Sequence, residues 1–386
     1  MDDNANAYDY VDVLDGLGIH FGHLKDIFTD CEFRGKNICG LFYPFLTEEG
    51  ICFTFNSPNF TSIYREESHF TELDLSDKYH VNNESLSWSL DEGFHRHANS
   101  TLEHYPYRTM GGGIRAGISM KLRNVKIDFD STCRSVFDGF KVLLHTPGEI
   151  PRLSKKYIQV PMNQHILISV KPTVMTTSKN LQNYPPHTRQ CFFEHERYLR
   201  FFKVYTQANC ELECLTNYTL SKCNCVTFSM PRNTATPVCG PAKIDCYRRA
   251  EFEVMSKEFH ENIDQPEGCI LKTVCNCLPS CTAILYNSEI STTKFTDDNT
   301  TNTLSSKQTT SQMVFFRIFF KENQYIASKR SELFGLTDFL ANVGGLLGLF
   351  LGISAIGVAE LAYFFIIRFN INLCYRISVV EEHSGE

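Results

Sequence analysis

The sequence of 386 residues lacks a basic run, the common hydrolase and phosphate-binding motifs, and any second long apolar stretch. Without a Gly-x-Ser-x-Gly elbow, a His-Glu-x-x-His pair or a phosphate loop, an enzyme is disfavoured. A net charge of −7 and no cluster of Lys and Arg argue against a nucleic-acid partner. Residues 1–30 contain neither the apolar core of a signal peptide nor a first membrane span. Attention therefore falls on the one long apolar run that is present.

That run, residues 339–367, is interrupted only by Asn342 and Glu360 and predicts a helix that spans a bilayer. A straight helix of this length would extend roughly 43 Å against a hydrocarbon core of about 30 Å, so we expect tilt or a break. Within the run, glycine recurs every four residues at Gly344, Gly348 and Gly352. A face of such small residues lets membrane helices approach one another closely.

Glu360 separates two interpretations of this segment. An acid within a span is costly unless it faces water or the interior of a bundle, so it indicates an ion path. The alternatives are a hydrogen-bonded contact between helices, or a single-pass receptor anchor in which the glycine face is incidental.

The cysteines indicate where the rest of the chain resides. Fifteen of the sixteen precede the apolar run, which favours an oxidising, extracellular location for that region. Arg368 and Arg376 follow the run and fit a cytosolic C-terminus, although Lys329 and Arg330 on the other flank weaken this charge argument. Asn-x-Ser/Thr sequons lie on the same side of the run as the cysteines and are candidate glycosylation sites: Asn59, Asn83, Asn99, Asn217 and Asn299.

Local patterns predict a mixed or antiparallel sheet with helices elsewhere. Strands are expected in residues 114–129, after a turn at 111–113, and in residues 139–145, 165–172 and 312–320. The last of these is apolar on both faces and should be central in the sheet. A helix with one packed face is predicted where Phe252, Met255, Phe259 and Ile263 recur at helical spacing.

Cysteine spacing permits a disulfide ladder. Cys210 and Cys214 would share one face of a helix, and Cys275 and Cys277 one face of a strand. The pairs Cys210–Cys277 and Cys214–Cys275 are possible, but spacing alone does not select them. Cys31 and Cys39 should close a short loop. Zinc is the rival role for clustered cysteines, and the extracellular location favours disulfides. Three histidines, His95, His97 and His104, have no nearby cysteine to complete a ligand set and are interpreted as solvated surface.

Several motifs carry a resemblance to one family. Gly344-Gly345, Gly348-Leu-Phe-Leu-Gly352-Ile-Ser354 and Glu360 resemble the second transmembrane segment of the epithelial sodium channel/degenerin/acid-sensing channel family. The strand Gly50-Ile-Cys52-Phe-Thr-Phe-Asn56 and the cysteine pattern of residues 191–281 also match this family. The residues 139–147 and 275–281 look most like the insect pickpocket branch. The resemblance covers roughly residues 20–368.

The resemblance implies an α+β, disulfide-rich extracellular domain followed by one transmembrane helix. The domain would contain a mixed or antiparallel β palm and β-ball, with a helical finger and thumb. The expected segments are residues 1–56 (start of the extracellular domain), 57–110 (outer finger-like subdomain), 111–190 (palm and β-ball strands), 191–281 (cysteine-rich thumb), 282–335 (palm strands and wrist), 336–368 (transmembrane pore helix) and 369–386 (cytosolic tail).

The resemblance also selects disulfides. In addition to the ladder it implies Cys191–Cys281, Cys223–Cys246 and Cys225–Cys239, and it leaves Cys133 and Cys269 as a possible extra bridge. The family partner of Cys52 would follow a first transmembrane helix that this chain lacks. We therefore expect Cys52 to be unpaired, and a truncated product or a short isoform would explain the missing helix.

For function, the resemblance implies a subunit of an amiloride-sensitive, sodium-selective channel in the plasma membrane. Three subunits, identical or related, would surround a pore in the lipid bilayer, with sodium as the permeant ion and no cofactor or metal. Gly352, Ile353 and Ser354 would form the selectivity filter. Ala341 would lie at the position whose enlargement holds degenerin-type channels open, and Asn342 at the outer mouth. Gly345 and Gly348 would line the pore, and Glu360 its inner end.

Gating by protons is not expected. Where acid-sensing relatives carry carboxylates after the cysteine equivalent to Cys246, this chain has Tyr247-Arg248-Arg249. Arg189 replaces an aromatic residue of those relatives just before Cys191. The alternative to a conducting subunit is a non-conducting single-pass receptor or adhesion protein, or a dominant-negative channel relative.

Overall fold

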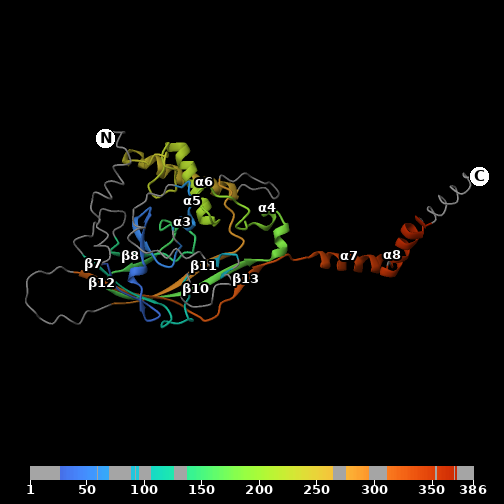
Figure 1. The fold of residues 1–386 in the computed structure, drawn as a ribbon, viewed down its shortest axis with the longest axis horizontal. Helices are drawn as coiled ribbons and strands as arrows, with labels where there is room; N and C mark the ends of the chain where they lie inside the picture. The colour runs from blue at the N-terminus through green and yellow to red at the C-terminus, as the bar shows by residue number, and fades with distance from the viewer. Residues whose placement is uncertain are drawn as a thin grey trace, which may run out of the picture. The chain divides into compact units, whose positions relative to one another are not determined.

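The computed structural model describes residues 27–58, 60–68, 88–91, 93–94, 106–125, 137–263, 275–294, 311–352, 354–368 and 370–371. The chain divides into two compact units, residues 1–330 and 331–386. The first unit combines strands, helices and six disulfides, which confirms the predicted α+β, disulfide-rich fold. The second unit contains helical segments within residues 336–368, joined by the non-helical Gly352 and Ser354 (Figure 1).

A seven-stranded mixed sheet forms the centre of the first unit. Its strand order is β11-β10-β12-β7-β1-β2, with β13 also paired to β10. Strand β10 runs parallel to β12 and β13, and the other pairs are antiparallel. The strands are β1 (Phe28–Phe33), β2 (Lys36–Asn37), β7 (Ile118–Val125), β10 (Gln164–Thr177), β11 (Ala283–Lys294), β12 (Ser311–Phe320) and β13 (Ala327–Arg330).

The central position predicted for residues 312–320 is confirmed. Strand β12 lies between β10 and β7, and Val314 and Phe316 are each 1% exposed. These side chains pack in one hydrophobic core with Ile166 and Ile168 of β10. The apolar character of β12 therefore follows from neighbours on both edges and a packed face.

Two predicted strands are shorter than expected. Residues 114–117 continue the turn at Gly111–Gly113, and the strand begins only at Ile118; residues 126–129 lie outside the described ones. Strand β8 (Gly139–Val142) ends before His145, because the chain then turns toward helix α5 (Gln207–Cys223), where the Ile150 N–H donates to Asn209 Oδ1 at 3.0 Å. In both places tertiary contacts override the alternating pattern.

Three two-stranded sheets complete the strands. They are β3 (Tyr43–Thr47) with β4 (Gly50–Thr54), β5 (Trp88–Ser89) with β6 (Gly93–Phe94), and β8 with β9 (Ile158–Pro161). The short helical elements are η1 (Cys39–Leu41), α3 (Phe60–Ile63), η3 (Lys179–Asn183), α4 (Pro186–Arg189) and η4 (Pro241–Lys243).

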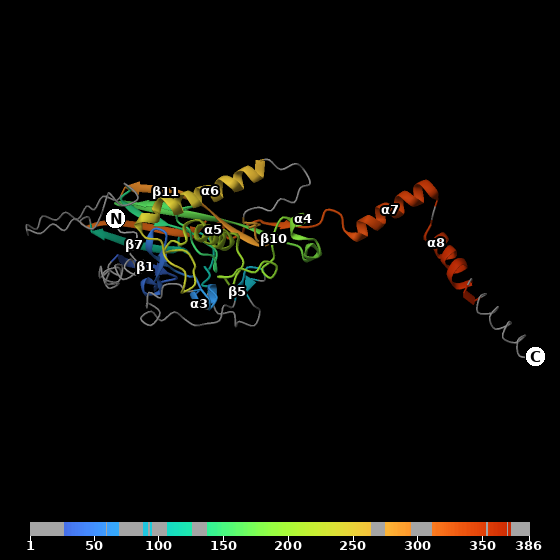
Figure 2. The same cartoon turned by 90° about the horizontal axis from the view of Figure 1, so that it is seen from above.

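The two long helices of the cysteine-rich region are α5 (Gln207–Cys223) and α6 (Ile244–Ile263). Figures 1 and 2 show both over the same face of the sheet. Helix α5 begins where Thr206 Oγ1 accepts the Asn209 N–H at 3.1 Å, and ends at Asn224, whose φ is 59°. A polar N-cap and a left-handed residue after the last turn are common helix limits.

The packed face predicted for α6 is wrong at Phe252 and Met255, while the side chains of Phe259 and Ile263 lie outside the described ones. Phe252 and Met255 are 67% and 56% exposed, whereas Ala250 and Val254 are 2% and 7% exposed. Cys246, Ala250 and Val254 recur at intervals of four and so share one side of the helix. The Cys223–Cys246 disulfide turns that side toward α5, so the covalent bond sets the rotation of the helix.

Candidate functional site

The segment with the predicted pore residues is two helices rather than one. Helix α7 (Leu336–Leu351) is followed by Gly352 and Ser354, then by α8 (Ala355–Ala362) and a π-helical turn (Tyr363–Arg368). Within the described residues, no single helix is both long and apolar enough to cross a membrane. Helix α7 and residues 356–368 meet those criteria together, with a bend of 89° between them (Figure 2). Of the two outcomes expected for this run, tilt or a break, the described residues have a break, so residues 336–368 are not one continuous helix.

Gly352 and Ser354 produce the break. Gly352 has φ of 64°, in the left-handed region that favours glycine, and its N–H donates to the Gly348 carbonyl at 3.1 Å. Ser354 Oγ then accepts the Gly357 N–H at 3.1 Å and begins α8. The helix stops and restarts for reasons that lie in these two residues, because glycine permits the turn and serine caps the next helix.

The break also determines what chemistry this segment can support. The last carbonyl groups of a helix have no partner within it and carry the negative end of the helix dipole. Here those carbonyls belong to the end of α7, next to Gly352 and the Ser354 hydroxyl. Carbonyl and hydroxyl oxygens are the groups that replace water around a small cation in selectivity filters.

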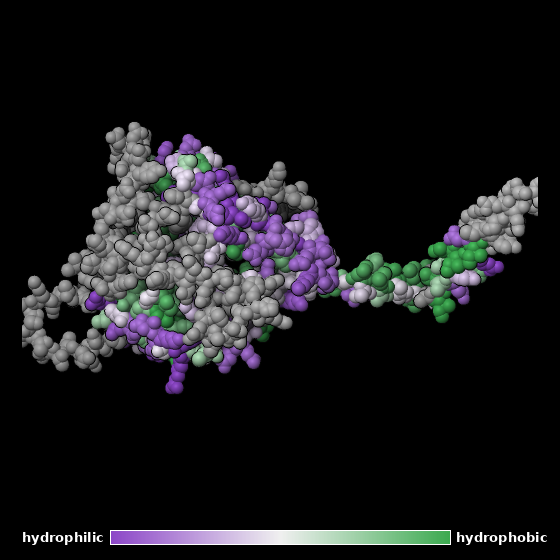
Figure 3. Space-filling model, viewed as in Figure 1, coloured by the Kyte–Doolittle hydropathy of each residue, from purple (hydrophilic) through white to green (hydrophobic). Residues whose placement is uncertain are grey.

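Exposure of the segment is unusually high for apolar residues. Helix α7 buries none of its side chains, and Leu349 and Phe350 are 79% and 77% exposed. In the π-helical turn that follows α8, Phe365 is 74% exposed. Figure 3 shows hydrophobic side chains gathered along α7 and α8. An apolar surface of this extent needs cover from lipid or from other protein chains.

The predicted pore residues fall on both sides of the break. Ala341, Asn342, Gly345 and Gly348 lie on α7, and Glu360 lies on α8; all five are exposed. A Cβ placed at Gly345 would meet no atom within 4 Å. Ile353 lies outside the described residues.

The disulfides in the described residues have the predicted pairing: the short loop predicted the first of them, and the resemblance implied the other five. They are Cys31–Cys39, Cys191–Cys281, Cys210–Cys277, Cys214–Cys275, Cys223–Cys246 and Cys225–Cys239. These cysteines therefore do not bind zinc. Among the described residues Cys52 is the one free cysteine; its Sγ lies 3.3 Å from Thr47 Oγ1, and burial raises the pKa of the thiol. Cys133 and Cys269 lie outside the described residues.

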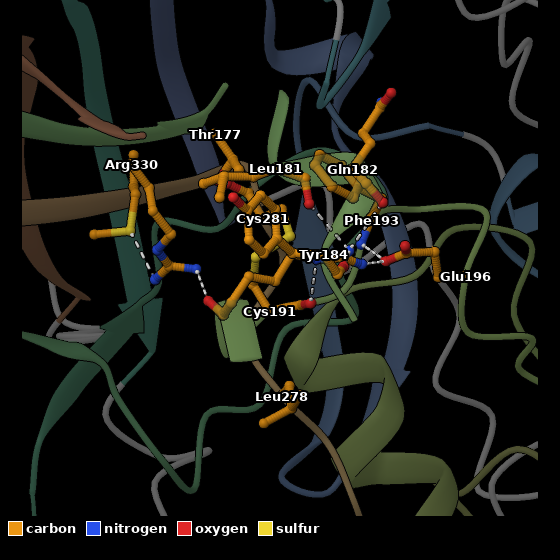
Figure 4. The surroundings of a disulfide bond; sticks show 12 residues. Thr177, Leu181, Gln182, Tyr184, Cys191, Phe193, Glu196, Leu278, Cys281 and Arg330 are labelled. Carbon is orange, nitrogen blue, oxygen red and sulfur yellow. Dashed lines mark hydrogen bonds and ion pairs between the residues drawn. A yellow bond between two sulfur atoms is a disulfide. The ribbon is translucent and has the colours of Figure 1, made fainter. Parts of the chain in front are cut away.

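Arg189 precedes Cys191 of the Cys191–Cys281 disulfide by two residues and is only 5% exposed. Figure 4 shows this disulfide with Tyr184 and Glu196, two partners of Arg189. Its guanidinium pairs with Glu196 and donates to the main-chain carbonyl of Tyr184 and, at 3.2 Å, of Cys191. The Glu196 carboxylate also accepts the Phe193 N–H at 2.8 Å. In the sequence Arg189 stands out only as a departure from acid-sensing relatives, and no sequence signal indicated that it is buried and contacts Glu196 and several main-chain carbonyls.

Further ionisable groups lie on and near α6, the region where acid-sensing relatives carry carboxylates. Arg248 and Arg249 are exposed on α6, and Glu251 pairs with Arg152 at 3.3 Å. Upstream of this pair, burial is the largest cause that raises the pKa of Glu149, and the neighbouring Glu211 raises it further. Burial lowers the pKa of His145. The sequence gave no indication of these two buried groups.

Of the five predicted glycosylation sites, the described residues include one, Asn217. Asn217 is exposed on α5, while Thr219 of the same sequon is fully buried. The other four asparagines and the three histidines of residues 95–104 lie outside the described residues. No group of three or more His, Cys, Asp and Glu residues in the described ranges could hold a metal ion.

Comparison with known proteins gives a consistent result. A family model described as amiloride-sensitive sodium channel matches residues 1–364. The chain is 29% identical to Pickpocket protein 28 of Drosophila melanogaster over 354 residues, which is 88% of this chain and 55% of that protein. It is 25% identical to human Acid-sensing ion channel 2 over 268 residues, 66% of this chain and 48% of that protein. The chain thus spans about half the length of the curated relatives it matches.

Proposed function

The chain belongs to the amiloride-sensitive sodium channel family, and on that premise we propose that it is a subunit of a sodium-selective cation channel of the plasma membrane. In this proposal the first unit is extracellular, the helices α7 and α8 lie in the bilayer, and the C-terminus is cytosolic. Three subunits, of one kind or of related kinds, surround the pore, and amiloride blocks it. The matched relatives are named as channels, or as pickpocket proteins, rather than as enzymes.

The observation that carries the proposal is the break at Gly352 and Ser354. Breaks in the helical backbone are tolerated at membrane depth where they line a water-filled cavity, because the freed polar groups then have a partner. Copies of this break around an axis would present main-chain carbonyls and Ser354 hydroxyls to a dehydrating cation. We propose that Gly352, Ile353 and Ser354 form the filter, with Gly345 and Gly348 above it and Glu360 below it.

The positions nearer the start of α7 have separate roles in this proposal. Asn342, at the outer mouth, attracts cations more weakly than an acid would, because an amide carries no charge. Ala341 precedes it, and its small side chain lets the pore close at this level, so a larger residue there would hold the pore open. Both residues are exposed on α7 and so are available to neighbouring subunits.

The test is ion preference in cells that express the subunit from its full-length transcript, alone and with pickpocket-type partners. A sodium current that amiloride blocks is expected. The substitutions Gly352→Ala and Ser354→Ala should lower the sodium-to-potassium permeability ratio, and Ser331→Ala, an exposed serine before α7, should not. Ion preference unchanged by either filter substitution would overturn the filter assignment. Assembly at the cell surface without any current would instead favour a non-conducting relative.

A further inference from the structure

Strand β13 ends the first unit at Arg330, one residue before the second unit begins. It pairs in parallel with the end of β10, from Val174 opposite Ala327 to Thr177 opposite Arg330. Whatever fixes Arg330 therefore fixes the point from which the chain continues to α7. The contacts of this residue are more numerous than its place at the end of a short strand would require.

The loop after β10 folds around the side chain of Arg189. Arg189 Nη1 donates hydrogen bonds to the carbonyls of Leu181 and Gln182 at 3.4 and 3.5 Å. Its guanidinium also donates to the carbonyls of Tyr184 and Cys191. A buried guanidinium with its five donors can hold several carbonyls in one arrangement. The loop from Ser178 to Cys191 is thus organised from the inside by one residue that it contains.

Arg330 is attached to this loop by both its side chain and its main chain. Its Nη1 donates to the Arg189 carbonyl at 3.1 Å, and its own carbonyl accepts the Ser178 N–H at 2.8 Å. Its Nη2 lies 3.6 Å from Met175 Sδ. In Figure 4, Arg330 and Glu196 lie on either side of the Cys191–Cys281 disulfide. Both ends of the loop are therefore tied to the last residue of β13.

The same loop is tied to the cysteine-rich region. Thr177 Oγ1 donates to the Cys281 carbonyl at 2.6 Å, and the Cys281 N–H donates to the Phe192 carbonyl at 2.8 Å. The disulfide joins Cys281 to Cys191, two residues after Arg189. A displacement of the cysteine-rich region at this point would reach Arg330 through one covalent bond and a few hydrogen bonds.

We propose that Arg330 is a positioning residue for gating: it couples the base of the cysteine-rich region to the pore segment through the Arg189 loop. This rests on the proposed channel function. Arg330 touches neither the ion nor the filter, so it acts on the balance between open and closed states rather than on ion preference. The Arg330 side chain donates to a main-chain carbonyl. A lysine at this position could still donate one charge-assisted hydrogen bond to that carbonyl, whereas a glutamine carries no charge and could form only a weaker, neutral one.

The first arm of the test measures the link itself without any current. Hydrogen exchange of the full-length subunit in detergent should be faster in residues 178–191 for Arg330→Gln, most of all at the amides of Arg189 and Gln190, because the lost side-chain contact is to the Arg189 carbonyl. Lys329→Gln is the matched control, because Lys329 is the preceding residue on the same strand, is exposed and loses the same charge. Exchange in this loop that is unchanged by Arg330→Gln would overturn the proposal.

The second arm measures gating by single-channel recording in cells that express the subunit from its full-length transcript. For Arg330→Gln we expect a change of about tenfold in the ratio of open to closed time, the scale set by loss of one charge-assisted hydrogen bond. The permeability ratio and the amount at the surface should not change, and Arg330→Lys should restore part of the effect. A purely structural residue would lower surface expression and leave gating of the surviving channels unaltered.

The outcomes separate this proposal from the proposed function. A loosened loop with normal gating would show that Arg330 only stabilises the fold, which overturns the positioning role and leaves the channel intact. A wild-type subunit that reaches the surface and carries no current with any partner would overturn the channel function and the gating role together, while the exchange data would still report whether Arg330 holds the loop.

Discussion

In residues 191–281, five disulfides and a shared hydrophobic core hold α5 and α6, whereas helix α7 buries none of its side chains. The first region is determined by contacts that the chain makes with itself. The second contains the residues proposed to conduct ions and has its apolar surface uncovered. The difference teaches that the fold of one region can be explained from the single chain, whereas the apolar surface of the other needs cover from lipid or from other protein chains.

The largest effect on unfolding of the first unit is expected at Arg189. The substitution Arg189→Gln would leave the Glu196 carboxylate half-buried without its guanidinium and several carbonyls without donors. Removal of one partner of a buried ion pair costs about 3–5 kcal/mol. Urea unfolding followed by circular dichroism measures this loss. Arg248→Gln, an exposed arginine on α6, is the control and should change little.

A smaller loss is expected when the Cys225–Cys239 disulfide is removed by serine at both positions. This bond closes a loop of 14 residues in sequence separation, for which loop entropy predicts about 3 kcal/mol. The same unfolding measurement applies, under non-reducing conditions. Cys52→Ser is the matched control, because that thiol forms no disulfide. Equal losses from the two variants would contradict the view that cross-links carry the stability of this region.

The next prediction has the opposite sign and depends on pH. Burial raises the pKa of Glu149, so the folded chain keeps this proton to a higher pH than the unfolded chain does. The contribution of Glu149 to stability therefore falls as pH rises from its ordinary range through the raised value. Glu149→Gln should stabilise the first unit at pH 8 and have little effect at pH 4. A stabilisation that is the same at both pH values would count against burial as the cause.

The smallest effect on the first unit is expected from Gly345→Leu, which nevertheless tests the other side of the comparison. A Cβ at Gly345 would meet no atom within 4 Å, so unfolding of the first unit should change by less than about 0.5 kcal/mol. Association between subunits should weaken, since small residues let membrane helices pack closely. Cross-linking at the cell surface measures this, with Leu349→Met on the same helix as control. Association unchanged by leucine would remove Gly345 from the interface.

The sequence predicted the features that local rules control. The apolar residues of β12 placed it in the centre of the sheet, and the cysteine spacing allowed the ladder that the family resemblance then selected. It failed where a distant contact decided the outcome. The rotation of α6 depends on Cys246 bonding to Cys223, so Phe252 and Met255 face solvent although their spacing is helical.

The candidate site shows the same limit. The length of the apolar run indicated tilt or a break, and Gly352 and Ser354 provide the break, but the sequence did not predict that two helices would meet there at 89°. The roles of Arg189 and Arg330 could not be predicted, because most of their partners are main-chain carbonyls, which every residue has, and because spacing alone does not single out Glu196 as the ion-pair partner of Arg189. Only the folded loop shows which carbonyls point toward them.

The way strand β10 pairs with β12 and then with β13 leaves a connection between those two strands that could accept inserted residues. Strand β10 pairs with β12 up to Val170 opposite Phe320 and with β13 from Val174 opposite Ala327, so six residues, 321–326, bulge opposite only three, 171–173. Because the ladder on each side of this detour sets the register, extra residues could be accommodated there without sliding β13. Within this segment Lys321 pairs with Glu289, and Asn323 Oδ1 accepts the Gly112 N–H at 2.5 Å, whereas residues 324–326 are exposed. Residues 324–326 are therefore the place for an epitope tag or a fluorophore, and evolution could lengthen the chain there without moving Arg330.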